Sequence, residues 1–295
     1  MTQEVEVSVI IPNLHSPIID RTIESVLAQK TSHPFEVIVV GMDRYDLVTK
    51  YEEVKFIKTA QPVSAGEARN IGIHESEGKI LFFIDSDCIA MPNWITTILD
   101  DFNSGWKVIG GSVLSPTDDF WQLVYNLSMF HEQLPSKNKG KHRYLATLNL
   151  AVHKDVIKKV GLLDAKLERG QDIEWTSRMT RAGYDLLFDP NAVIEHHPSR
   201  HTFEALKKDN FRSGYYSIAV RQKYPNIFNM PPLLKTASVW RIFKPLIAGL
   251  TMLRIVLSSK EVRQHPKIIP YILKQKAAWC DGAISRLEET ENATG

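Results

Sequence analysis

Cysteine is scarce in this chain, and its scarcity narrows the kind of protein that the chain encodes. The 295 residues include two cysteines, Cys88 and Cys280. Two cysteines so far apart cannot form a disulfide framework or a cysteine-rich zinc site, which is typical of a reducing compartment. The N-terminus also lacks the basic start and apolar core of a secretory signal peptide. We therefore expect a cytoplasmic protein.

Long apolar runs are absent too. The most apolar part of the C-terminal region, residues 239–258, is interrupted by Arg241, Lys244 and Arg254, and its longest uncharged stretch is nine residues. A membrane-spanning helix needs about 20 apolar residues. Two interpretations stay open for this segment: a buried helix, or an amphipathic helix that lies on a membrane surface.

Charge is unevenly distributed along the chain. The first 195 residues carry 20 lysines and arginines against 27 aspartates and glutamates, whereas the rest carries 16 against 7. A basic C-terminal part indicates contact with an anionic partner, such as the inner face of a membrane. Its basic residues are not interleaved with a base-stacking aromatic motif, so we do not expect a nucleic-acid partner.

Strand and helix patterns alternate through the first half. Apolar, β-branched runs predict strands at residues 7–11, 35–40, 54–57 and 80–84, and helical periodicity predicts helices at residues 16–29 and 65–75. This alternation predicts a mostly parallel sheet with helices on both faces, in which ligands bind at the carboxyl ends of the strands. Further along we expect helices at 94–102, 120–130 and 172–182, strands at 106–113, 186–188 and 192–194, a polar and mobile loop at 135–143, and a helical tail.

Two carboxylates one residue apart follow the apolar run that ends at Ile84. Asp85 and Asp87, in the stretch FFIDSDC, repel each other unless a cation or water separates them. Oxygen ligands of this kind suit Mg²⁺ or Mn²⁺ bound to a phosphate-bearing substrate. The alternatives are a solvated turn with aspartate as a capping residue and a phosphatase with an aspartyl nucleophile, whose motif usually lies near the start of the catalytic domain.

The order of motifs along the chain is more informative than any single one. They are VSVIIPNL from Val7, residues 21–29, FEVIVV from Phe35, GEARNIG from Gly66, FFIDSDC from Phe82, and then residues 147–155, 161–164, 170–183 and 190–197. This series, over about residues 5 to 220, resembles the family 2 glycosyltransferases of the GT-A fold. The resemblance implies a mixed, mostly parallel Rossmann-like sheet in residues 1–224, and the basic helical extension follows in residues 225–295.

The resemblance also implies an inverting, metal-dependent transfer of a sugar from a nucleoside diphosphate to a hydroxyl group. Asp87 is the expected metal ligand, with His196 or else His197 beside it, and Asp172 is the expected base. The residues expected to bind the donor nucleotide are Pro12, Asn13, Asp43, Arg69, Asp85 and Asp87. The residues expected on the acceptor side are Asn149, Gln171 and Glu174.

Two departures from the family pattern affect specificity. The family usually shows acidic residues that contact the nucleobase after the second strand, whereas this chain reads VGMD there, so that either Asp43 or backbone groups would hold the base. A UDP donor is expected first, and GDP and dTDP donors stay open. Residues 211–214 lack the full Gln-x-x-Arg-Trp pattern of processive members, which favours single additions to a polysaccharide, a lipid-linked sugar or another glycan. The rival interpretations are a catalytically inactive carbohydrate- or nucleotide-binding relative and a nucleotidyltransferase, although PNLHSP is no phosphate-binding glycine loop.

Overall fold

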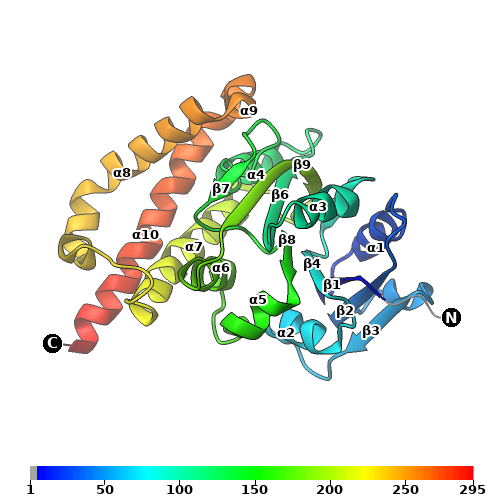
Figure 1. Cartoon of the computed structure of the whole chain (residues 1–295). Coiled ribbons are helices and arrows are strands. Elements are labelled where there is room, and N and C mark those ends of the chain that lie inside the picture. Colours follow the sequence, from blue (N-terminus) through cyan, green and yellow to red (C-terminus); the bar gives the residue numbers. More distant parts are fainter. Residues whose placement is uncertain (1–4, 295) are drawn as a thin grey trace. The chain divides into compact units, whose positions relative to one another are not determined.

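The chain folds into two compact units, which are described one at a time (Figure 1). The structure is a computed structural model that describes residues 5–294. The first unit contains the chain up to Leu114 and Lys137–His197, and the second contains Ser115–Ser136 and the chain from Pro198 onward. The division expected at residue 224 falls inside the second unit. The chain enters this unit twice, which a division along the sequence cannot represent.

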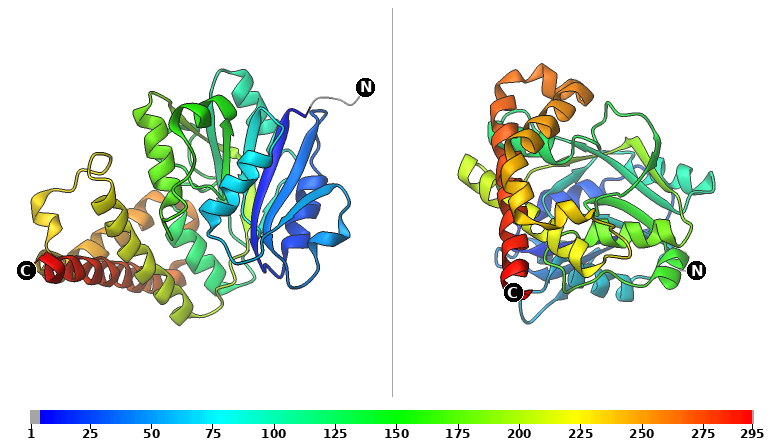
Figure 2. Two further views of the ribbon diagram at one scale, coloured as in Figure 1. Left: turned by 90° about the horizontal axis from the view of Figure 1, so that it is seen from below. Right: turned by 90° about the vertical axis from the view of Figure 1, so that its left-hand side faces the viewer.

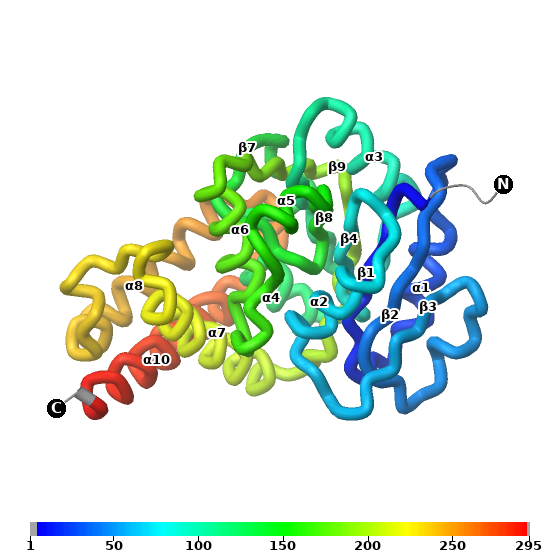
Figure 3. Tube along the Cα trace, turned by 60° about the horizontal axis from the view of Figure 1, so that its bottom comes forward, coloured from blue at the N-terminus to red at the C-terminus, as the bar shows by residue number. Residues whose placement is uncertain are grey.

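The first unit is built on one mixed sheet with the strand order β3-β2-β1-β4-β8-β6-β9-β5, and β7 also pairs with β9. The pairs β1–β2, β1–β4, β2–β3 and β6–β9 are parallel, whereas β8 is antiparallel to both β4 and β6. Figure 3 shows the strands β3, β2, β1 and β4 side by side. The strands are β1 Val7–Leu14, β2 Phe35–Met42, β3 Val54–Lys58, β4 Ile80–Ile84, β5 Cys88–Ala90, β6 Val108–Leu114, β7 Gly140–His142, β8 Asn149–His153 and β9 Leu186–His196.

Helices cover both faces of this sheet, as the alternation of elements predicts. Every residue of β4 is buried, and its side chains alternate between the faces. Phe82 meets Trp94 edge to face at 5.1 Å between ring centroids, and Phe83 meets Trp175 in the same way at 5.6 Å. The helices of this unit are α1 Ile19–Leu27, α2 Ala65–Glu75, α3 Trp94–Asn103, α5 Lys154–Val160 and α6 Gln171–Arg181, with a short 3₁₀ turn at Val48–Lys50. The expected mixed, mostly parallel sheet flanked by helices is confirmed.

Two local predictions differ from the structure. The polar segment 135–143, expected as a mobile loop, contains β7, which pairs with β9. Lys139 anchors it, since its ammonium group binds the buried carboxylates of Asp101 and Asp189. The two short strands expected at residues 186–194 form one strand, β9, whose pairing with β6 shifts register between Gly111 and Ser112.

The second unit is helical, and the long helix α10 packs against both α7 and α8 (Figure 2). Helices α7 and α10 approach so closely that only glycine fits at two positions. A Cβ atom at Gly214 would lie 1.8 Å from the Trp279 carbonyl oxygen, and one at Gly282 would lie 1.9 Å from the Phe211 carbonyl oxygen. Its elements are α4 Phe120–Met129, α7 Phe203–Lys223, α8 Ala237–Ser258, α9 Lys260–Gln264 and α10 Ile269–Thr294, with 3₁₀ turns at Pro232–Lys235 and Pro266–Ile268.

The apolar character of residues 239–258 raises the question whether a helix there could span a membrane. Among residues 5–294, no helix combines the length and the apolar character required to cross a bilayer.

Candidate active site

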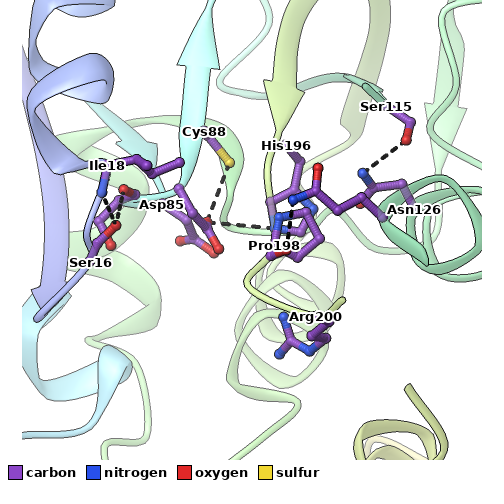
Figure 4. A network of polar contacts seen from close by, with 12 residues as sticks. Ser16, Ile18, Asp85, Cys88, Ser115, Asn126, His196, Pro198 and Arg200 are labelled. Carbon is purple, nitrogen blue, oxygen red and sulfur yellow. Dashed lines mark hydrogen bonds and ion pairs between the residues drawn. The ribbon is translucent and has the colours of Figure 1, made fainter. Parts of the chain in front are cut away.

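The turn between β4 and β5 presents the two carboxylates at the carboxyl end of a buried strand. The Cys88 amide donates to the Asp85 carbonyl oxygen at 3.0 Å and closes the turn. The Ser16 hydroxyl, just beyond β1, donates to the Ser86 carbonyl oxygen at 2.7 Å (Figure 4). Ligands bind at this edge of open α/β sheets. The turn is therefore held in the expected place, with Asp85 and Asp87 partly exposed.

Arg69 lies on α2 and is buried, with 4% of its side chain exposed. Its guanidinium group binds the Asp85 carboxylate at 2.5 Å. Ser64 caps α2 by accepting the Glu67 amide. The Arg69–Asp85 ion pair fixes Asp85 beside α2. Arg69 is therefore not an exposed side chain on the surface of the helix.

Asp87 lies beside His196, because β5 and β9 pair antiparallel with Cys88 opposite His196. The His196 Nε2 atom is 3.6 Å from an Asp87 carboxylate oxygen. His197 follows the last residue of β9; its Nε2 atom lies 2.6 Å from a Glu195 carboxylate oxygen, and its backbone amide donates to the Asp87 carbonyl oxygen at 2.8 Å. Of the two imidazole groups, that of His196 is thus the one beside the Asp87 carboxylate.

One ligand atom each from Asp87, Cys88 and His196 lies within 4.8 Å of the others. Burial raises the pKa of the Cys88 thiol well above its ordinary value, and the charges of Asp87 and Asp85 act in the same direction. A protonated thiol is a poor ligand for a hard cation. The carboxylate and imidazole therefore fit Mn²⁺ or Mg²⁺, which would complete its coordination with substrate oxygens and water.

Asp172 lies in the first turn of α6, and it is close enough to Arg69 and Asp85 to be affected by their charges. Burial raises the pKa of the Asp172 carboxyl above its ordinary value. The Ile173 amide and the Arg69 guanidinium oppose this shift, whereas the Asp85 carboxylate adds to it. A carboxylate destabilised in this way is a stronger proton acceptor than an ordinary surface aspartate.

The ends of β1 and β2 lie beside the acidic turn between β4 and β5. Pro12 and Asn13 pair in register with Val40 and Gly41. The Asn13 side chain donates to the Met42 carbonyl oxygen at 3.0 Å, and its oxygen accepts the Ser16 amide at 3.1 Å. These contacts present backbone groups of both strand ends at the same edge of the sheet.

Asp43 follows β2 and is buried. Its carboxylate accepts the amide groups of Tyr45 and Val48 at 3.1 and 2.8 Å. The carboxylate of Asp43 therefore shapes the loop after β2.

The three side chains expected on the acceptor side are buried and hydrogen-bonded within the protein. Asn149 accepts the Trp94 indole N–H and donates to the Ser112 and Ala192 carbonyl oxygens, all at 2.8–2.9 Å. Gln171 donates to the Leu167 carbonyl oxygen. Glu174, 1% exposed, forms a two-pronged ion pair with Arg178. These side chains stabilise the fold, and we do not propose them as acceptor contacts.

The sequence does not predict the positions of two residues at this edge of the sheet. Ser16 supports the acidic turn through a contact 70 residues away in the chain, and the sequence marks it only by its position just after a strand. Cys88 belongs to the FFIDSDC stretch, but its place beside His196 depends on the β5–β9 pairing. Neither relation is visible in the local pattern.

Charge at this edge favours a cation. Asp85 pairs with the buried guanidinium group of Arg69, Asp172 lies close enough to both to be affected by their charges, and Asp87 follows Asp85 by two residues. Neighbouring ionised carboxylates repel one another. A divalent ion beside Asp87 would offset this repulsion and would attract the phosphates of a substrate.

Comparisons with known proteins identify the family and the fold. The family model of glycosyl transferase family 2 matches residues 8–161. Glycosyltransferase AglE from Haloferax volcanii is 31% identical over 225 residues, which are 72% of this chain and 73% of the relative. The fold resembles mannosyltransferase PcManGT from Pyrobaculum calidifontis, solved with GDP-mannose and Mn²⁺, at a TM-score of 0.59, with 14% identity and coverage of 98% and 88% of the two chains. It also resembles GalNAc-T7, solved with UDP, GalNAc and Mn²⁺, at a TM-score of 0.55, with 16% identity and coverage of 78% and 52%. The chain belongs to glycosyl transferase family 2 and is a glycosyltransferase of the GT-A fold.

Proposed function

We propose that the protein transfers a sugar from a nucleoside diphosphate to an acceptor hydroxyl, with inversion at the anomeric carbon. The observation that carries the proposal is the placement of Asp87 and His196 at the same sheet edge as Arg69, Asp85 and Asp172. This edge thus combines two side chains that could hold a metal ion, a positive group and a destabilised carboxylate. Departure of a nucleoside diphosphate and attack by a hydroxyl need these three kinds of group.

The donor nucleotide is proposed to lie over the ends of β1, β2 and β4. The backbone of Pro12 and Asn13 would line the base, with the loop that Asp43 shapes beside it. Asp85, held by Arg69, would face the ribose, and the Arg69 charge would favour the diphosphate. We expect UDP ahead of GDP and dTDP. Neighbours of this fold have been solved with GDP-mannose and with UDP, which supports a nucleotide-sugar donor.

Asp87 and His196 would hold Mn²⁺ or Mg²⁺. When bound, the ion neutralises the charge that builds on the leaving diphosphate. Asp172 takes the proton of the acceptor hydroxyl while the hydroxyl attacks the anomeric carbon from the face opposite the leaving group, so a single displacement inverts the configuration. The raised pKa of Asp172 makes its carboxylate a better base at neutral pH.

The acceptor is proposed to be a glycan, either lipid-linked or part of a polysaccharide, extended by one sugar at a time. The single-addition proposal is supported by the sequence of residues 211–214, which only loosely resembles the processive segment. Gly214, in this segment, packs against α10.

The direct test is to incubate the protein and Mn²⁺ with UDP-, GDP- and dTDP-sugars and a panel of glycan acceptors. The anomeric configuration of the product would be read by NMR. A product of opposite configuration to the donor supports the proposal. Retention of configuration would contradict the direct displacement. Nucleotide binding without transfer to any acceptor would favour the inactive, nucleotide-binding alternative.

A further inference from the structure

Helix α8 of the second unit carries an apolar surface that the other described residues of this unit leave bare. Its opposite face packs through Trp240, Ala248 and Ile255, which are buried within the unit. The bare face consists of six large apolar side chains, each 46–72% exposed. They are Ile242, Phe243, Leu246, Leu250, Leu253 and Leu257, and we call them the α8 ridge.

The ridge is continuous rather than scattered. From Phe243 to Leu257 its members recur at alternating spacings of three and four residues, which places them on one stripe of a helix. Single exposed apolar residues are ordinary on protein surfaces, whereas a contiguous patch marks an interaction site. The ridge therefore indicates a surface that binds a partner.

Charge decides what kind of partner fits. Helix α8 contains three basic residues and no acidic one, and from Lys235 to Lys267 the chain holds seven basic residues against a single acidic one, Glu261. Two copies of the chain paired through this segment would bring charges of one sign together, which disfavours association. An anionic surface attracts the same segment.

Part of that positive charge is paired within the unit. Arg241 binds Glu288, Lys244 binds Asp281, and Arg254 binds Glu132. The arginine side chains remain largely exposed, at 67% and 72%. Further exposed basic residues lie just before α8, on α9 and in the 3₁₀ turn that follows α9: Lys235, Lys260, Arg263 and Lys267. Positive charge thus lies near both ends of the apolar ridge.

We propose that the α8 ridge inserts into the surface of an anionic lipid membrane, with the helix lying in the plane of the interface. At 22 residues, α8 is about 33 Å long. Its arginines and lysine rule out a span but suit the headgroup region, where basic side chains extend toward phosphates while leucines enter the acyl boundary. This proposal does not depend on the transfer reaction proposed above.

The test is co-sedimentation of the full chain with phosphatidylcholine vesicles, with and without phosphatidylglycerol, at low and high salt. We expect binding that requires the anionic lipid and weakens with salt. Leu250→Glu should weaken partitioning by about tenfold, and adding Leu246→Glu should weaken it by a further factor of about ten. Leu273→Glu, at an exposed leucine of α10 outside the ridge, is the matched control and should bind as the wild type does.

Folding of these variants is checked by circular-dichroism melting, and Leu250→Trp gives an independent readout. Its indole emission should shift to the blue on anionic vesicles, because tryptophan suits the interface. Equal vesicle binding by wild type and Leu250→Glu, or no binding by the wild type, would overturn the proposal. So would a dimer in light scattering that Leu250→Glu dissociates, since a second copy would then cover the ridge.

Discussion

The two units of this protein use charged residues differently. In the first unit, ion pairs join buried and partly exposed groups: buried Arg69 holds the partly exposed Asp85, and partly exposed Lys139 holds the buried carboxylates of Asp101 and Asp189. In the second unit, the ion pairs Arg241–Glu288 and Arg254–Glu132 lie on the surface, and α8 exposes a large apolar area. The contrast indicates that the first unit is built to hold and tune reactive groups, whereas the second is built to present a surface.

The largest expected effect tests the catalytic role proposed for the first unit. Asp172→Asn should lower the rate of transfer by about 10²- to 10⁴-fold, because the acceptor loses its base, while donor binding is kept. The acid limb of the wild-type rate profile should lie above the ordinary aspartate pKa of 3.8, since burial raises the pKa of Asp172. Initial rates across pH and calorimetric donor binding would check both points.

The same substitution should affect activity and stability in opposite directions: the rate of transfer should fall, whereas the melting temperature should not. The folded pKa of Asp172 lies above its unfolded value, so its ionised form disfavours the folded state and stability falls as pH rises through the folded pKa. Asp172→Asn should therefore melt at or above the wild-type temperature at neutral pH. A variant that is inactive because it melts lower would not identify a base.

The second prediction separates the two neighbouring histidines. His196→Ala should weaken Mn²⁺ binding by about 10- to 100-fold, a loss reported even for groups that only support metal ligands. His197→Ala is the matched control, because the His197 imidazole lies beside Glu195. Manganese titration by electron paramagnetic resonance measures both, and equal losses would contradict the assignment of His196.

The third prediction compares ion pairs across the two units. Lys139→Met leaves two buried carboxylates without their cation, and should cost roughly 2–3 kcal/mol of the free energy of unfolding. This is below the usual cost for a fully buried pair, because Lys139 itself is 46% exposed. Arg254→Met breaks a surface pair and should cost about 0–1 kcal/mol. Urea unfolding of both variants, monitored by a spectroscopic probe in each unit, would show whether Lys139→Met loses more free energy of unfolding than Arg254→Met does.

A further small effect is expected from a buried charge in the second unit. Burial lowers the pKa of Lys276 to about 8, and its ammonium group donates to the Ser128 carbonyl oxygen at 3.0 Å. Because the folded pKa lies below the unfolded value of 10.5, stability should rise as pH rises from about 8 to 10.5. Lys276→Met should add about 1 kcal/mol of stability at pH 7 and flatten that rise. Unchanged urea curves at pH 7 and pH 9 would exclude this effect of burial.

How much the sequence predicts depends on whether an interaction is local. Strand ends follow from apolar runs, so the sheet and the position of Asp85 and Asp87 could be predicted. The choice of His196 over His197 required the pairing of β5 with β9, which brings together residues more than a hundred positions apart. The interior roles of Asn149 and Glu174 likewise depend on Trp94 and Arg178, which no local pattern connects to them.

The C-terminal region shows the same limit. Its basic helical character was readable from composition, but its relation to earlier segments was not. Helix α10 packs against α7 and contacts α4, so residues that looked like an appendage form the core of a unit with residues 115–136. Cutting the chain after Tyr224 would therefore expose that core instead of removing a separate tail.

The measurement that tests the central claim most directly is calorimetric titration of a nucleoside diphosphate into the wild type and Asp87→Asn, each with Mn²⁺ and with EDTA. We predict that the wild type binds UDP, or another nucleoside diphosphate, much more tightly with Mn²⁺, and that Asp87→Asn removes this metal-dependent part. Equal affinity with Mn²⁺ and with EDTA in the wild type would contradict a metal-assisted donor site at the turn after β4.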